Sequence, residues 1–161
     1  MKSQVGVSHG PGVAESFGLS TRPAAMTSEF EIIDRVVGVA DEKRAKRGVS
    51  ALSTAERVAS DIWSASGIIG NGSFQYFFEC GLDAENCARA YEAIGMPEAA
   101  RIFRLALSLF PDSHPHEDFA ERVAFIRERE DAFDKLGMEI VRLDSKMEAL
   151  LSAYLKNAGL E

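Results

Sequence analysis

The sequence of 161 residues has no long apolar run, only two cysteines and no excess of basic residues. Each of these features marks a large class of proteins. No stretch reaches the ~20 apolar residues that a membrane-spanning helix needs. Two cysteines are too few for the disulfide framework of a small secreted domain. The net charge of −7 disfavours direct nucleic-acid binding, which depends on many lysine and arginine contacts with phosphates. These absences predict a cytoplasmic protein that neither enters a membrane nor binds nucleic acid itself.

Sequence patterns that carry chemistry are also scarce. The chain has no Gly-X-Ser-X-Gly elbow and no glycine-rich phosphate loop that ends in Lys-Ser/Thr. His114 and His116 flank Pro115 and form a pair that can chelate a metal, but no third histidine or cysteine lies near them in the sequence. A hydrolase or metal enzyme built on this pair stays as an alternative. The main prediction is a protein with no catalytic residue, no cofactor and no metal.

The apolar residues recur at the three- and four-residue spacing of amphipathic helices, and no segment alternates with the two-residue period of a strand. Residues 28–157 are therefore predicted to form a single compact all-α domain of about six helices. Residues 1–27 are rich in Gly, Ser and Pro and lack this periodicity, so we predict a disordered N-terminal tail. The capping box Ser-Thr-Ala-Glu at 53–56 predicts where the second helix begins.

Residues 71–111 hold five of the ten phenylalanines, two of the three tyrosines and both cysteines. A turn is predicted at Asn71-Gly72, followed by a short aromatic helix. The next helix is expected to stop at Gly95, and the one after it at Pro111. The helical spacing places the phenylalanines in the core, so this segment defines the fold rather than a binding site. Its structural residues are Asn71, Gly72, Phe74, Phe77, Phe78 and Gly95.

The outer helices are predicted from weaker patterns. The first helix is expected to bury Phe30, and Trp63 on the second helix is expected to bridge to a neighbouring helix. One long helix is predicted from about Glu117 to Lys135. Gly137 is predicted to break the chain before a last helix at about 138–157. The long helix would bury Phe119, Val123, Ile126 and Phe133.

The segment 71–111 resembles the DNA-mimic protein 19 family, a set of bacterial all-helical domains. The family pattern is an Asn-Gly-Gly-Phe turn followed by aromatics, a helix that ends near Ile-Gly and a helix that ends in Phe-Pro. The resemblance covers about residues 28–157. Ser73 stands where the family has its second Gly, Tyr76 where it often has Gln, and Cys80 where it commonly has Asn.

The resemblance implies a dimer whose acidic surface imitates DNA and occupies the DNA-binding face of a helix-turn-helix regulator. In such a complex, carboxylates spaced like phosphates meet lysine and arginine side chains. A homodimer is therefore possible here, and the expected partner is a basic DNA-binding protein.

Two acidic segments fit this expectation. Residues 112–134 carry eight acids against three arginines, a net charge of −5. On one continuous helix, Glu117, Glu121 and Glu128 would point away from the apolar stripe, with Asp131 to one side. Residues 79–98 carry five more acids, opposed in the sequence by Arg89 alone. The residues predicted to bind the partner are Glu117, Glu121, Glu128, Asp131, Asp83 and Glu85.

The leading hypothesis is thus a non-catalytic interaction domain that acts as a DNA mimic. The alternative is an immunity-like or structural protein that binds its partner through an apolar surface around Trp63 and Tyr76. The two hypotheses differ in their response to salt. Binding through carboxylates weakens steeply as the salt concentration rises, whereas binding through an apolar surface does not.

Overall fold

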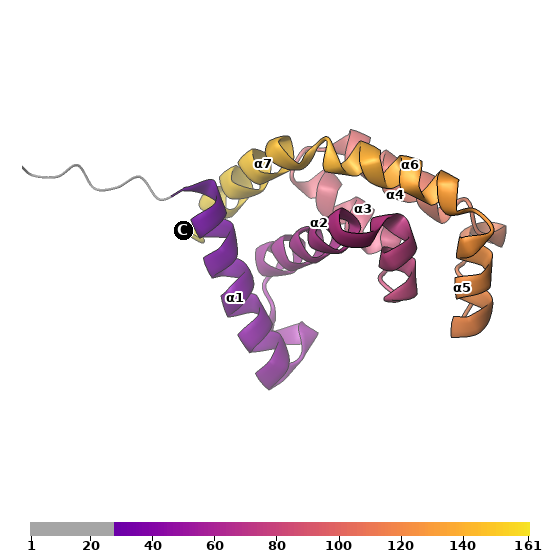
Figure 1. The fold of residues 1–161 in the computed structure, drawn as a ribbon. Coiled ribbons are helices and arrows are strands. Elements are labelled where there is room, and N and C mark those ends of the chain that lie inside the picture. The colour runs from indigo at the N-terminus through magenta and orange to yellow at the C-terminus, as the bar shows by residue number, and fades with distance from the viewer. Residues whose placement is uncertain (1–27) are drawn as a thin grey trace, which may run out of the picture.

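A computed structural model describes residues 28–161, which form seven α-helices, two short 3-10 helices and no strand (Figure 1). The prediction of one all-α domain is confirmed, with one helix more than expected. The predicted tail at residues 1–27 lies outside the described residues. No helix in the described part of the chain is long and apolar enough to cross a membrane. The elements are α1 (Glu29–Arg47), η1 (Val49–Ala51), α2 (Thr54–Glu79), α3 (Ala84–Ala93), α4 (Pro97–Leu107), η2 (Pro111–Ser113), α5 (Phe119–Arg127), α6 (Glu130–Val141) and α7 (Asp144–Asn157).

The first two helices begin at capping boxes. The Ser53 hydroxyl accepts a hydrogen bond from the Glu56 amide at 3.2 Å, and the Glu56 carboxylate accepts one from the Ser53 amide at 2.9 Å. Ser28 and Glu31 make the same reciprocal pair at the start of α1. Each box satisfies two backbone amides that a helix start leaves without partners. The helix start predicted at Ser53 is therefore confirmed.

The turn predicted at Asn71-Gly72 is present as a kink inside α2. Gly72 and Ser73 depart from helical geometry, with φ/ψ of −158°/24° and 61°/−171°. A positive φ is unfavourable for a residue with a side chain. The Ser73 hydroxyl offsets part of this cost because it donates a 2.9 Å hydrogen bond to the Phe133 carbonyl of α6. The kink thus ties α2 to α6 at the point where α2 turns.

Beyond the kink, a cluster of phenylalanines joins α2, α4 and α6. The Phe78 ring lies 4.8 Å from the Phe110 ring and 5.6 Å from the Phe133 ring, centroid to centroid. Phe74 meets Phe103 of α4 at 5.0 Å, edge to face. Such pairs add to the stabilisation that comes from burying the rings themselves. The members of the cluster, all at most 2% exposed, are Phe74, Phe77, Phe78, Phe103, Phe110 and Phe133.

The prediction of one long helix at residues 117–135 is wrong, because the chain breaks between α5 and α6. Arg129 has the non-helical φ/ψ of −125°/22°. Its guanidinium lies 3.7 Å from the centroid of the Phe125 ring, and Phe125 in turn stacks on Phe110 at 4.9 Å. No Gly or Pro lies at the break. Phe119, predicted to be buried, is 60% exposed at the start of α5.

Gly137 does not break the chain, and the prediction that it does is also wrong. It lies within α6 and is buried, and the chain turns only after Val141. A Cβ atom at position 137 would overlap the Ser73 hydroxyl and lie 3.2 Å from the Ser73 Cα. Gly137 is therefore a close-packing residue, which lets α6 approach the kink of α2.

At the other end of the molecule, Phe30 is 52% exposed, so its predicted burial is wrong as well. Its ring packs edge to face on Trp63 with a centroid distance of 5.6 Å. The prediction that Trp63 bridges to a neighbouring helix is confirmed, because this contact joins α1 to α2.

Candidate partner-binding surface

The acidic residues predicted to bind a partner fall into two regions of the structure. Residues 117–134, here called the α5–α6 corner, lie at the end of the molecule opposite α1 (Figure 1). Glu117 precedes α5, Glu121 lies in its first turn, Glu128 caps its end and Asp131 lies in the first turn of α6. All four side chains are exposed. They do not form the single straight ridge that we predicted, because the helix breaks at Arg129.

The arginines of the corner make few contacts with its carboxylates. The Arg122 guanidinium donates to the carbonyl oxygens of His116 and Glu117 at 2.6 and 3.1 Å. Arg129 stacks on Phe125 and reaches one carboxylate, that of Glu128, at 3.2 Å. His116 Nδ1 lies 4.0 Å from Glu121, and this pair is ionic only when the imidazole is protonated. Two further carboxylates accept hydrogen bonds from uncharged groups, Asp118 from the Glu121 amide and Asp134 from the Gln75 side chain, both at 2.9 Å. Among the described residues, Glu117, Glu130 and Asp131 make no side-chain hydrogen bond or ion pair, and their charge is available to solvent or to a partner.

The second acidic region, here called the α3–α4 face, consists of Glu85, Glu92 and Glu98 with the cations that bind them. The Arg104 guanidinium donates to Glu85 at 3.0 and 3.1 Å and to Glu92 at 2.6 and 3.2 Å. Lys146 of α7 binds Glu98. The expectation that Arg89 alone opposes these acids is wrong, because Arg104 and Lys146 also reach them.

The pKa values of two carboxylates on the α3–α4 face reflect these contacts. The hydrogen bond from Arg104 lowers the pKa of Glu92, and the one from Lys146 lowers the pKa of Glu98. Asp83 and Glu85 lie at the start of α3. The Asp83 carboxylate caps this helix by accepting from the Asn86 amide at 2.9 Å. Both residues therefore already have intramolecular partners.

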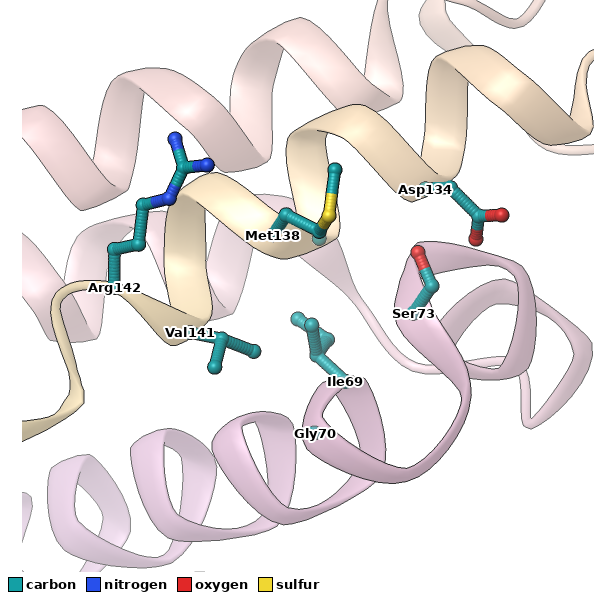
Figure 2. Close-up of a pocket in the computed structure, with 8 residues that line it drawn as sticks. Ile69, Gly70, Ser73, Asp134, Met138, Val141 and Arg142 are labelled. Carbon is teal, nitrogen blue, oxygen red and sulfur yellow. The ribbon is translucent and has the colours of Figure 1, made fainter.

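A groove that the sequence did not predict lies between the kink of α2 and helix α6. Figure 2 shows Ile69 of α2 and Val141 of α6 on opposite sides of it, with Ser73 and Asp134 at one end, and Met138 also lines it. Its volume is about 490 Å³. The side chains of Met138 and Val141 are 57% and 44% exposed. A reading of Gly137 as a contact between helices, rather than as a helix break, would have placed α6 against the kink and indicated this groove.

The apolar patch suggested around Trp63 and Tyr76 is divided in the structure. Trp63 is half-buried beneath Phe30, while Tyr76 is 47% exposed just beyond the kink. Gly72 lies close to Tyr76, since a Cβ atom at Gly72 would stand 2.6 Å from the Tyr76 Cβ. Gly95, the last residue of the predicted structural set, ends α3 with a φ of 82°, a conformation that glycine adopts without strain.

The residues considered for chemistry lie apart. His114 and His116 follow η2 in a loop. Within residues 28–161, no group of three or more His, Cys, Asp or Glu side chains comes together in a way that would hold a metal ion. Cys80 is exposed and Cys87 is buried, and neither forms a disulfide. Burial raises the pKa of the Cys87 thiol, which therefore stays protonated at neutral pH.

These features define an all-helical domain with a kinked second helix, a phenylalanine core and an acidic corner. Residues 50–158 match the model of the DMP19-like protein family. The match covers more than half of the chain, which therefore belongs to that family. No curated protein and no solved structure matches the chain.

Proposed function

We propose that this chain is a non-catalytic interaction domain whose α5–α6 corner binds a basic DNA-binding protein in the place of DNA. The observation that carries the proposal is the exposed, mostly unpaired carboxylates of that corner in a DMP19-like chain. Lysine and arginine side chains that normally meet phosphates would meet these carboxylates instead. On this proposal the protein works in the cytoplasm, does not itself bind nucleic acid, and acts as a monomer or a homodimer.

The pairing of the acids favours the corner over the α3–α4 face as the contact surface. A carboxylate that already binds an arginine must give up that partner, or share it, before it can bind another protein. Glu85 shares Arg104 with Glu92, whereas Glu117 and Asp131 make no ion pair within the described residues. Asp83 and Glu85 would then contribute through their long-range field more than through direct contact.

Charge reversal tests the proposal. The variant changes Glu117, Glu121, Glu128 and Asp131 to Lys, and the control makes the same charge change at exposed acids of α1, namely Glu29, Asp34, Asp41 and Glu42. Partners would be captured from the native cytoplasm at low and at high salt. The corner variant should lose partners that the control retains, and high salt should release them from the wild type. Equal capture by the two variants would refute the proposal.

A second candidate function rests on the groove between α2 and α6. Its exposed Met138 and Val141 are features of a surface that binds an apolar segment of a partner. Met138→Asn would weaken such binding and leave the charge of the corner in place. Capture that survives high salt and disappears in Met138→Asn would favour this function over DNA mimicry.

A further inference from the structure

A second cavity, of about 660 Å³, lies among the end of α1, the first half of α2 and helix α3. Three arginines from three different helices line it: Arg44 of α1, Arg57 of α2 and Arg89 of α3. Asp61 is the one acidic residue among its lining residues, which leaves an excess of two positive charges. In a chain with a net charge of −7, this is a local concentration of positive charge.

The arginines of this cleft have donors to spare. The Arg44 guanidinium donates to the Ser60 hydroxyl at 2.8 Å, but its buried Nε has no hydrogen-bond partner in the described part of the protein. Arg57 is exposed and makes no side-chain hydrogen bond or ion pair to any residue in the range 28–161. Arg89 is 65% exposed, and its one ion pair, with Glu85, is long at 3.7 Å. The N–H groups of Arg57 and Arg89 are exposed, so they are the donors that a bound anion would meet first.

The other side chains of the cleft suit the remainder of an organic ligand. Val58 and Ala90 provide apolar wall, and Asn86 and Thr54 provide uncharged polar groups. The volume lies in the range of cavities that hold small organic molecules, roughly 300–1,000 Å³, and is larger than an inorganic ion needs. A planar guanidinium group can donate two parallel N–H hydrogen bonds to two oxygens of one phosphate. Three of them exceed what a single carboxylate requires.

We propose that the cleft lined by Arg44, Arg57 and Arg89 is a binding site for a small organic phosphate. The phosphate contacts the guanidinium groups, and the organic portion lies against Val58 and Ala90. The site uses neither the α5–α6 corner nor the groove at the kink, so it is independent of the proposed partner binding. Asp61 opposes the ligand electrostatically, because it is the one acidic residue among those that line the cleft.

The experiment titrates the full chain with AMP, inorganic phosphate and adenosine while the backbone amide signals of residues 54–61 and 86–93 are followed by NMR. AMP should shift these signals saturably. Inorganic phosphate should shift the same signals with about tenfold weaker affinity, and adenosine should not shift them up to about 10 mM. If neither AMP nor phosphate shifts these signals, the proposal is wrong. Equal affinity for AMP and phosphate would overturn the claim that the cleft recognises an organic portion.

Variants of opposite sign separate recognition from damage to the fold. Arg57→Gln should weaken AMP binding about tenfold or more, whereas Asp61→Asn should strengthen it about threefold, because it removes the competing carboxylate. Arg101→Gln makes the same charge change at an exposed position outside the cleft and should leave binding within about twofold of the wild type. Equal losses in Arg57→Gln and Arg101→Gln would show a non-specific charge effect and refute the site.

Discussion

The two acidic regions differ in what their carboxylates contact. On the α3–α4 face, Arg104 binds Glu85 and Glu92 together, and Lys146 binds Glu98. At the α5–α6 corner, one carboxylate, that of Glu128, pairs with an arginine. The α3–α4 carboxylates therefore bind cations of neighbouring helices, whereas Asp118 and Asp134 of the corner accept hydrogen bonds from uncharged groups and Glu117, Glu130 and Asp131 have no side-chain partner among residues 28–161. The number of acids in a segment does not measure the charge that it presents, because the fold decides which cations reach them.

The two regions look alike along the chain. Residues 79–98 carry five acids and one base, a net of −4, and residues 112–134 carry eight acids and three bases, a net of −5. The difference arises because Arg104 and Lys146, which lie later in the sequence, bind the carboxylates of the α3–α4 face. Arg122 and Arg129 of the α5–α6 corner instead contact carbonyl groups and an aromatic ring.

The largest effect on stability is expected at Phe133, the residue through which the α5–α6 corner packs into the core. Phe133 of α6 is fully buried in the phenylalanine cluster, so Phe133→Ala should lower the free energy of unfolding by about 3–5 kcal/mol. Phe119 of α5 is 60% exposed, so Phe119→Ala should change it by less than about 0.5 kcal/mol. Urea denaturation measures both. Similar losses in the two variants would show that α5 is buried more deeply than the structure has it.

The next largest effect concerns how the corner is held against α2. Gly137→Ala forces α6 away from Ser73 and should cost about 1–3 kcal/mol. The control is Gly38→Ala in α1, where an added Cβ meets no atom within 4 Å and should stabilise the helix by about 0.5–1 kcal/mol. Adding Ser73→Gly to Gly137→Ala should recover part of the loss, because the overlapping hydroxyl is gone. Strict additivity in this double-mutant cycle would contradict the proposed contact.

A smaller effect on thermal stability is expected from removing an arginine, and it should depend on whether that arginine is paired with a carboxylate. Arg104→Gln removes the cation that two carboxylates share and should lower the midpoint of thermal unfolding at low salt. Arg127→Gln at the corner removes a cation with no partner among residues 28–161 and should leave the midpoint unchanged. The difference between the variants should shrink at high salt, since exposed ion pairs are screened. The opposite ranking would reverse the comparison of the two regions.

The smallest effect expected is a change in the pKa of one carboxyl group, that of Glu92. Arg104 lowers the pKa of Glu92 below its ordinary value of 4.5. Because the folded-state pKa is the lower one, the pair contributes stability above the ordinary value and loses it as the pH falls through the lowered value. NMR titration of the Glu92 carboxyl should therefore give a midpoint below 4.5 that rises in Arg104→Gln. A midpoint that does not change in the variant would show that Arg104 does not hold this carboxylate in solution.

The sequence predicts those parts of this fold that depend on neighbouring residues. Capping boxes, the turn at Gly72 and the helical spacing of the phenylalanines all act within a few residues. The role of Gly137 depends on Ser73, which lies far away in the sequence and leaves no local pattern. The break at Arg129 carries no Gly or Pro to mark it. The glycine break and the long helix were therefore predicted wrongly.

The candidate surface is predictable to the same extent. Composition alone finds the acidic segment, and the four side chains predicted to bind a partner are exposed. The shape of the surface is not predictable, because no Gly or Pro marks the break at Arg129. The pairing of Glu85 and Glu92 is not predictable either, because Arg104 comes from the following helix.

The most direct test of the account is competition between this protein and DNA for the same partner. Partners captured on the immobilised wild-type chain would be challenged with duplex DNA at constant ionic strength. If the corner takes the place of DNA, duplex DNA should release the partner, and the variant with Lys at Glu117, Glu121, Glu128 and Asp131 should never capture it. A partner that stays bound to the wild-type chain in the presence of excess duplex DNA, or that binds the variant equally well, would contradict the account.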